Sequence, residues 1–318
     1  PRRRGVRRSQ TGRGGSMKRL RKVPASAGVL ALLALLGIGA PAPADIPSRA
    51  PEPARSGGPA ARKQLRVCAD GNNMPFSNER GEGFENRLAS LVAHDLGEDL
   101  VTTWWPQRRG FFRNTLKAHR CDVVIGVPTA LDMVETTRPY YRAGYVFVFA
   151  PGAPHVKGLD DPALHGLRIG VPMVGDDGAN PPPVLALASR GLVDNMRGYS
   201  VYGDYREDSP PADLIRALGK GEIDVAIAWG PLAGYYAMHA TPRLAVAPIP
   251  PSEAPRGLSF EFDIGMGVRH GDHALRDALD GVLTRRVKEV DAILRAYGVP
   301  RVPAEARGGA TTAEAMPR

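Results

Sequence analysis

The stretch from Leu65 to Glu85 constrains the fold of this chain more than any other part of the sequence. Leu65 to Ala69 predict a short buried strand, and a loop rich in Asp, Asn, Gly and Pro follows. Gly83 and Phe84 then open an amphipathic helix. A loop between a strand and a helix lies at the carboxyl end of a parallel sheet, where open α/β folds form ligand crevices. Taken alone, the pattern fits any βα turn of an α/β enzyme equally well.

The same alternation of strand and helix runs through most of the chain. Segments with strand character alternate with segments whose apolar residues recur at helical spacing. The strands are expected at 65–69, 100–105, 122–127, 145–150, 167–171, 223–229 and 262–268, and a further segment around 197–202 is left unassigned. The helices are expected at 85–96, 110–118, 184–190, 212–218, 232–238 and, as one long final helix, 274–297. This rhythm predicts an α/β fold with mixed, mainly parallel sheets flanked by helices.

Two similar cycles, separated by segments rich in Pro and Gly, predict a protein of two lobes. We expect residues 64–152 together with 260–300 to form lobe 1, and residues 153–259 to form lobe 2. The chain would then cross between the lobes twice, near 150–162 and near 248–260. Two crossovers of this kind form a hinge about which lobes open and close.

The excess positive charge of the chain lies at its N-terminus. The formal net charge is +9, but ten Lys and Arg residues fall between Arg2 and Lys22, and no acid precedes Asp45. Without residues 1–44, 32 basic residues stand against 33 acidic ones. A nucleic-acid-binding protein needs a basic surface on its folded part, so the composition argues against nucleic acid as a partner.

The basic N-terminus has the organisation of an export signal. A basic segment at 17–22 precedes an apolar segment at 28–39 and a small-residue cleavage site at 42–44. Residues 1–16 form an upstream extension of this leader. The apolar segment is shorter than a membrane span needs, so a periplasmic protein without a membrane anchor after cleavage is the expectation, and a membrane anchor is the alternative. Residues 45–63 and 301–318 lack apolar periodicity and predict a disordered tether and tail.

The chain contains two cysteines, Cys68 in the first predicted strand and Cys121 just before the third. An exported protein tolerates disulfides, so neighbouring strands would allow this pair to form a bridge. The alternative is two buried thiols, because cysteine is also a common core residue. Two cysteines and scattered histidines give no reason to expect a structural zinc site or another metal centre.

The order and spacing of several segments resemble the type II periplasmic solute-binding proteins. The segments 69–76 and 83–85, 116–126 (LKAHRCDVVIG) and 137–141 (TRPYY) resemble the first lobe, and 166–171 (GLRIGV) and 221–226 (GEIDVA) resemble the second. Six further segments resemble the MoxJ/XoxJ-type proteins associated with quinoprotein methanol dehydrogenases. These are 104–111 (WWPQRRGF), 175–180 (GDDGAN), 193–199 (VDNMRGY), 202–206 (YGDYR), 229–235 (WGPLAGY) and 262–269 (FDIGMGVR).

The sequence departs from the amino-acid-binding relatives at both of their charged anchors. Those relatives hold the ligand carboxylate with an Arg shortly after the third strand, where this chain has Ala130 to Met133. They hold the ammonium with an acid after the last strand of lobe 2, where this chain has Trp229 and Gly230. Desolvated charges without partners cost several kcal/mol, so we do not expect an ordinary amino-acid receptor.

Several residues are candidates for lining the cleft. Asn72, Asn73 and Phe76 lie in the first cleft loop and Trp229 at the end of the last strand of lobe 2. Amides there would bond a polar ligand and the rings would form a wall, although Asn is also an ordinary turn residue. Asp176 and Asp204 lie in loops of lobe 2. Asp176 and the adjacent Asp177 could bind a hard cation through oxygen ligands, but the spacing lacks the acidic pattern of an EF-hand and favours a capped tight turn. For Asp204 a surface loop is favoured over a position in the cleft.

Aromatic and Arg residues cluster at the end of the second predicted strand. Trp104 and Arg109 are candidates for the cleft, while Trp105 and Arg108 are candidates for a partner surface. Aromatic residues combined with Arg are typical of interface anchors. The alternative is that one Trp belongs to the core and that the Arg side chains are simply solvated.

The resemblance implies a periplasmic accessory protein of a PQQ-dependent methanol or alcohol dehydrogenase system. Such a protein would bind the dehydrogenase or its cytochrome c, or hold a small molecule for its maturation or activation. The alternative is a receptor of an ABC importer for a small solute that is not an amino acid. A cleft enzyme is less favoured, because the sequence has no Gly-x-Ser-x-Gly, His-Glu-x-x-His or Walker motif. Nothing in the sequence points to a cofactor.

Overall fold

The structure is a computed structural model that describes residues 63–173, 180–200 and 209–301. These residues lie in one compact unit, Gly58–Arg318. The predicted leader and the predicted tail beyond Arg301 lie outside the described residues, as do the loops that contain Asp176 and Asp204. Among the helices that the structure describes, none has both the length and the apolar composition of a membrane span.

One group of strands, which we call the first half-sheet, is built around β1 and contains three parallel strands in the order β4-β1-β5. Strand β12 joins β5 antiparallel, and the beginning of β7 joins β12. The strands are β1 (Gln64–Ala69), β4 (Asp99–Trp104), β5 (Val123–Pro128), β6 (Glu135–Thr136), β7 (Tyr141–Phe149) and β12 (Glu261–Val268). A two-stranded ribbon, β2 (Asn72–Asn73) with β3 (Ser77–Asn78), follows β1.

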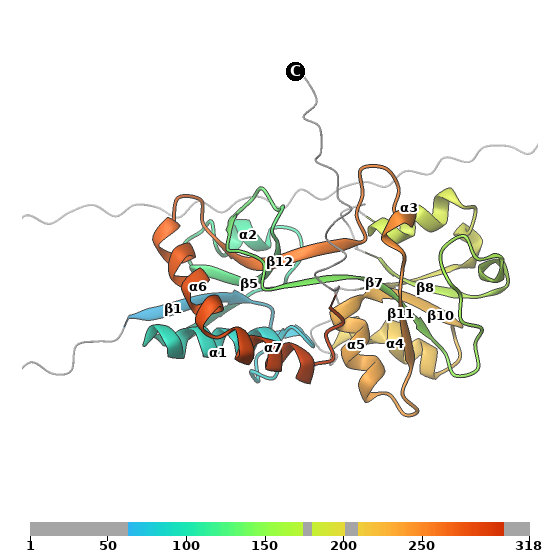
Figure 1. Cartoon of the computed structure of the whole chain (residues 1–318), viewed down its shortest axis with the longest axis horizontal. Coiled ribbons are helices and arrows are strands. Elements are labelled where there is room, and N and C mark those ends of the chain that lie inside the picture. Colours follow the sequence, from blue (N-terminus) through green and yellow to red (C-terminus); the bar gives the residue numbers. More distant parts are fainter. Residues whose placement is uncertain (1–62, 174–179, 201–208, 302–318) are drawn as a thin grey trace, which may run out of the picture. The chain divides into compact units, whose positions relative to one another are not determined.

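Alternating side chains of the first half-sheet face two different hydrophobic clusters. Val67 and Ile125 contact the cluster formed with three helices, whereas Cys68 and Val124 contact the cluster that includes Phe111. This is the two-residue period of a strand covered on both faces. The helices are α1 (Phe84–Leu96), α6 (His273–Arg285) and α7 (Val287–Ala296) on one face and the short α2 (Phe111–Asn114) on the other. Figure 1 shows α1, α6 and α7 side by side.

The other group of strands, the second half-sheet, has the parallel order β9-β8-β10, with the end of β7 antiparallel to β10 and β11 antiparallel to β7. Its strands are β8 (Ile169–Met173), β9 (Met196–Ser200), β10 (Val225–Trp229) and β11 (Ala245–Pro248). Its helices are α3 (Pro182–Ser189), α4 (Asp213–Gly219) and α5 (Gly230–His239). Ile227 faces the cluster of α3, whereas Ala226 and Ala228 face the cluster of α4 and α5, so this half-sheet is also covered on both faces.

Strand β7 belongs to both half-sheets. Gly144 pairs with Glu261 of β12, whereas the next residue, Tyr145, pairs with Trp229 of β10. The sequence predicts the first crossing at 150–162, after an apolar strand assigned to lobe 1. In the structure the pairing partner changes between Gly144 and Tyr145, because the apolar run that ends at Phe149 is long enough to serve as a central strand of the second half-sheet.

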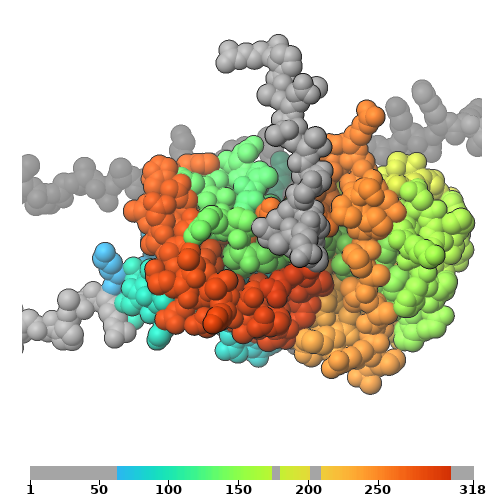
Figure 2. Space-filling view, viewed as in Figure 1, coloured from blue at the N-terminus to red at the C-terminus, as the bar shows by residue number. Residues whose placement is uncertain are grey.

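The predicted final helix, 274–297, consists of two helices in the structure. The break lies at Arg286, whose backbone leaves helical geometry (φ −105°, ψ 24°). Arg285 and Arg286 both donate to the carboxylate of Asp95 on α1, at 2.5 and 2.6 Å. The break allows α6 and α7 both to pack against α1, on the face shown in Figure 2 (orange to red). The predicted helix 110–118 is also shorter, because regular helical geometry ends at Thr115.

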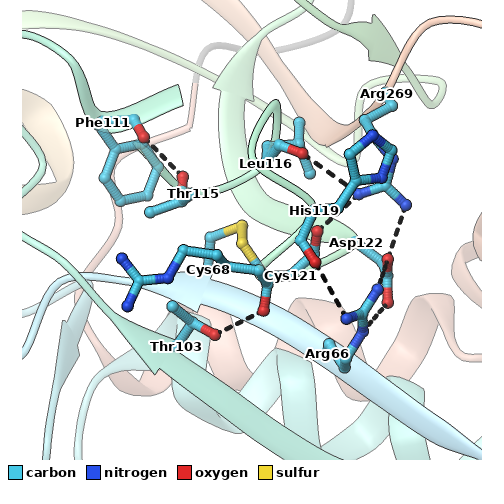
Figure 3. The surroundings of a disulfide bond; sticks show 11 residues. Arg66, Cys68, Thr103, Phe111, Thr115, Leu116, His119, Cys121, Asp122 and Arg269 are labelled. Carbon is cyan, nitrogen blue, oxygen red and sulfur yellow. Dashed lines mark hydrogen bonds and ion pairs between the residues drawn. A yellow bond between two sulfur atoms is a disulfide. The ribbon is translucent and has the colours of Figure 1, made fainter. Parts of the chain in front are cut away.

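The predicted disulfide is confirmed. Cys68 in β1 and Cys121 just before β5 are bonded, with their Cα atoms 5.4 Å apart (Figure 3). The neighbouring Asp122 accepts a bidentate pair of hydrogen bonds from Arg66, at 2.7 and 2.6 Å, and one from Arg269 at 2.6 Å. Burial alone would raise the pKa of Asp122, but the bonds from the two Arg side chains outweigh it and hold the pKa below its usual value. The bridge and the Arg–Asp–Arg network together fix the start of β5 against β1.

Candidate functional site

A cavity of about 410 Å³ lies where the carboxyl ends of strands from both half-sheets meet. Gly126 and Pro128 of β5 contribute to its wall from the first half-sheet, and Pro172 of β8 and Ala228 of β10 contribute from the second. This is the location that the alternation of strand and helix predicts for a ligand crevice. The wall is mainly apolar, and its aromatic members are Phe76, Tyr141, Tyr145, Trp229 and Phe262.

Asp70 fixes the loops that form one edge of the cavity. Its side chain is buried, and its carboxylate accepts the backbone N–H of Asn72 at 2.9 Å and that of Gln107 at 2.7 Å. The loop after β1 is thereby tied to the loop after β4. The amide of Asn73 also donates to the side-chain oxygen of Gln107 at 3.1 Å. Asn73 and Gln107 are therefore held at the cavity wall, which both of them line.

The two asparagines of the first loop have different surroundings. Asn73 lines the cavity, whereas the side-chain oxygen of Asn72 accepts the backbone N–H of Ser209 at 3.0 Å. Ser209 precedes α4 of the second half-sheet, so this bond links the two half-sheets beside the cavity. Asn72 is itself absent from the described wall.

Three aromatic rings from three strands stand in contact at the cavity wall. Tyr145 and Trp229 are register partners on β7 and β10, with ring centroids 5.4 Å apart and planes inclined by 67°. Trp229 and Phe262 of β12 are 5.8 Å apart at 60°. Edge-to-face contacts of this kind are the favoured geometry of aromatic pairs. The indole of Trp229 is thus fixed from both sides, and all three rings border the cavity.

Glu85 is the acidic residue of the described wall, and it is not among the cleft residues predicted from the sequence. Its side chain is only 8% exposed, and burial raises the pKa of its carboxyl to about 8. The carboxyl occupies the space beside Gly126, where a Cβ would lie 2.2 Å from its Oε1 atom. A signal was available in the sequence, because Glu85 precedes Leu88 and Ala89 by three and four residues and so shares the buried face of the helix.

The ionisable neighbours of Glu85 are tyrosines. Burial, followed by the proximity of Glu85, raises the pKa of Tyr141 well above its usual value, and burial is the main cause of the same shift at Tyr140. Both phenols therefore stay neutral. No Lys or Arg is found among the described residues that line the cavity. Among these described residues a ligand carboxylate would find no cationic partner, which agrees with the expectation that Ala130 to Met133 do not supply an Arg anchor.

The residues predicted at the end of the second strand lie outside the cavity. Trp104 is the last residue of β4 and is half-buried opposite Ala69 of β1. Trp105 packs against the cluster that contains the disulfide, and the guanidinium carbon of Arg120 lies 5.2 Å from its ring centroid. Arg108 and Arg109 are exposed. Of the predicted cleft residues, the structure brings Asn73, Phe76 and Trp229 to the cavity and leaves Asn72, Trp104 and Arg109 off its described wall.

Residues 108–120 are a basic segment that directly follows Gln107 of the cavity wall in the sequence, and we call this segment the basic rim. It carries five Lys and Arg residues and no Asp or Glu. All five side chains are exposed, and they are Arg108, Arg109, Arg113, Lys117 and Arg120. The basic rim begins one residue after Gln107 of the cavity wall and ends next to Cys121 of the disulfide. Among the residues that the structure describes, no group of three or more His, Cys, Asp or Glu side chains is placed to bind a metal ion.

Comparison with known proteins agrees with this architecture, although no protein-family model matches the chain. The periplasmic binding protein XoxJ from Methylobacterium extorquens AM1 has a TM-score of 0.61 and 36% sequence identity, over 75% of this chain and 99% of XoxJ. MxaJ from Methylophaga aminisulfidivorans has a TM-score of 0.65 and 26% identity, over 75% of this chain and 100% of MxaJ. The fold is therefore that of the periplasmic binding proteins.

The sequence comparison narrows this class to one family. The protein MoxJ from Methylorubrum extorquens is 32% identical to this chain over 283 residues, which are 86% of this chain and 93% of MoxJ. The chain belongs to the MoxJ family. The predicted resemblance to the MoxJ/XoxJ-type proteins and the predicted α/β fold of a periplasmic binding protein are both confirmed.

Proposed function

We propose that this chain is a periplasmic accessory protein that binds the PQQ-dependent methanol or alcohol dehydrogenase of its system, or the cytochrome c of that system. Membership of the MoxJ family supports this role, because the MoxJ and XoxJ proteins are the group associated with methanol dehydrogenase systems. We also propose that the basic leader is removed after Ala44, so that the protein acts without a membrane anchor.

The basic rim is the observation that carries the proposed binding to a protein partner. Five exposed cations within thirteen residues, with no acid among them, attract an acidic surface and speed its association. The half-buried Trp105 beneath Arg120 adds an aromatic anchor of the type enriched at interfaces. The disulfide at Cys121 holds the basic rim on the first half-sheet, so little ordering of this surface is needed when a partner binds.

The cavity favours a second role, the binding of a small solute. A largely apolar cavity where the two half-sheets meet is the usual ligand site of this fold class, and it would serve either the dehydrogenase system or an importer. We propose that the chain acts by binding and not by catalysis. The described wall has one acid, Glu85, and no His, Cys or Ser, so it offers no pair of nucleophile and base.

The test is to add the chain that begins at Asp45 to a PQQ-dependent methanol dehydrogenase, and to measure dye-linked methanol oxidation and co-migration on a sizing column. We expect a complex, together with a change in the rate of oxidation. The double variant Arg113→Glu/Lys117→Glu should bind at least about tenfold more weakly, because reversed charges repel an acidic partner.

The matched control is the double variant Lys220→Glu/Lys288→Glu, which makes the same change in net charge at exposed positions outside the basic rim. The control should bind like the original chain. The absence of a complex and of any effect on the rate would contradict the accessory function. A chain that binds neither dehydrogenase nor cytochrome, but binds a purified importer permease, would establish the importer receptor instead.

A further inference from the structure

We infer that the cavity binds a small organic ammonium ion that lacks a carboxylate, held between the rings of Trp229, Tyr145 and Phe262 and the carboxyl group of Glu85. The inference rests on the part of the proposed function in which the chain holds a small molecule, and it names the chemical class of that molecule. It does not depend on the basic rim or on any protein partner.

The lack of Lys and Arg among the described lining residues disfavours an anionic ligand. Glu85 lines the cavity, and no Lys or Arg is found among the described lining residues. An anionic group that entered would lose its hydration and would find no cationic partner among these described residues. Burying an unpaired charge costs far more than the apolar contacts of a small ligand return. Carboxylates, phosphates and zwitterionic amino acids are therefore poor ligands for the part of the wall that the structure describes.

The aromatic residues supply the attraction for a cation. Tyr145, Trp229 and Phe262 form a continuous group, with neighbouring ring centroids 5.4 and 5.8 Å apart and ring planes inclined by 67° and 60°. All three rings border the cavity, and an aromatic ring attracts an alkylammonium ion that lies over its face. Tyr141 and Phe76 also line the cavity. Burial raises the pKa of Tyr141, and Tyr141 is close enough to Glu85 for the carboxyl to raise that pKa further.

Glu85 distinguishes a cation from a neutral apolar ligand. No described residue makes a hydrogen bond with its carboxyl group, which lies against Gly126 and close to the neutral phenols Tyr140 and Tyr141. A neutral apolar ligand would bury this carboxyl further without giving it a partner, at a cost in free energy. An ammonium ion would pair with the carboxylate and at the same time contact the rings.

Because the ligand ammonium pairs with the ionised carboxylate of Glu85, the affinity for the ligand depends on pH in a defined direction. In the empty cavity burial holds the pKa of Glu85 near 8, so that roughly one tenth of the carboxyl groups are ionised at pH 7 and roughly nine tenths at pH 9. A permanently charged ligand must release a proton from Glu85 when it binds below pH 8. Its affinity should therefore rise about tenfold between pH 7 and pH 9. Tyr140 and Tyr141 stay neutral over this range and do not contribute.

The test uses choline as the probe and 3,3-dimethylbutan-1-ol as its neutral isostere. Binding to the chain that begins at Asp45 is measured by calorimetry and by tryptophan fluorescence, because Trp229 lines the cavity whereas Trp104 and Trp105 do not. We expect choline to bind at least about tenfold more tightly than the isostere. We also expect proton release at pH 7 and the tenfold rise in affinity toward pH 9.

Two variants distinguish specific binding of a cation from nonspecific binding in an apolar cavity. Glu85→Gln, which keeps the size of the side chain, should lower choline affinity at pH 9 at least about tenfold and abolish its pH dependence, and circular dichroism reports whether it folds. Glu79→Gln, at an exposed position, should change neither property. Equal binding of choline and the isostere, undiminished binding to Glu85→Gln, or no choline binding at all would overturn the inference. Such results would leave dehydrogenase binding through the basic rim unaffected, so the two proposals fail separately.

Discussion

The cavity and the basic rim are neighbours in the sequence but opposite in chemistry. Gln107 lines the cavity and Arg108 begins the basic rim. The described residues of the cavity wall are mainly apolar and aromatic, with one buried acid and no Lys or Arg, whereas the basic rim is exposed and carries five cations without an acid. The contrast indicates two modes of recognition in one protein, one by burial and aromatic contact and one by long-range charge.

The two regions also depend on different parts of the fold. The cavity rests on strand ends from both half-sheets and on Asp70, which ties two loops together. The basic rim belongs to the first half-sheet alone and is held there by the disulfide and by the core contacts of Phe111 and Leu116. A substitution that destabilises one region should therefore leave binding at the other region largely unchanged.

The largest effect should follow removal of the disulfide. The bond closes a loop of 53 residues, so the double variant Cys68→Ala/Cys121→Ala should lose about 4 kcal/mol of unfolding free energy, measured by urea denaturation. Binding of the dehydrogenase should weaken more than binding of choline, because the bridge lies beneath the basic rim. An equal loss of both would show that the two regions are not independent.

The second-largest effect should be on the pH dependence of stability, and the group responsible is Glu85 in the cavity wall. The pKa of Glu85 is raised to about 8 in the folded chain, against the ordinary value of 4.5. The folded state therefore holds a proton that the unfolded state has lost, and stability falls as the pH rises from about 4.5 to about 8. Between pH 5 and pH 7 the loss should amount to about 2 kcal/mol.

Glu85→Gln should flatten this dependence and make the chain more stable than the original at pH 7, as shown by urea denaturation at several pH values. The control is Glu79→Gln, which should keep the original pH profile. A Glu85→Gln profile that falls as steeply as that of the original chain would show that another group is responsible. In that case the carboxyl of Glu85 would be ionised in the empty cavity.

The smallest effect concerns the contact of Arg120 with Trp105 in the basic rim. Arg120→Ala should cost about 0.5–1 kcal/mol of stability, the value of a cation–π contact at an exposed site. It should also weaken dehydrogenase binding, with no effect on choline. Arg120→Lys, which keeps the charge, should restore most of the binding but only part of the stability. Complete loss of binding in Arg120→Lys would show that the partner contacts the guanidinium group directly and does not respond to the charge alone.

Local sequence patterns predicted most of the fold. Apolar periodicity is clear in the strand at 65–69 and in the helix from Phe84 to Leu96. The alternation of strands and helices predicted the parallel pairing of β8 with β10. The crossing within β7 was missed because it depends on pairing between distant segments. Arg142 of β7 forms ion pairs with Glu261 and Asp263 of β12, at 3.2 and 3.1 Å, and no local pattern reveals such partners.

The break between α6 and α7 and part of the cavity wall also depend on contacts between distant residues, which local sequence patterns do not reveal. Arg286 ends α6 where it meets Asp95, a residue 191 positions away. The sequence selected Asn73, Phe76 and Trp229, which line the cavity, because they follow strands. It missed Tyr145 and Phe262, which reach the cavity only through the pairing of β7 with β10 and β12. Glu85 could have been predicted from the sequence, because it precedes Leu88 by three residues and therefore lies on the buried face of the helix.

The most direct test of the account is the salt dependence of the complex with the dehydrogenase. The dissociation constant of the complex would be measured by sedimentation from about 20 to about 200 mM salt, for the original chain and for Arg113→Glu/Lys117→Glu. We expect the original complex to weaken severalfold as salt screens the basic rim, and the variant complex to be weak throughout, with a shallow salt dependence. A complex of equal strength in both proteins, insensitive to salt, would contradict this expectation.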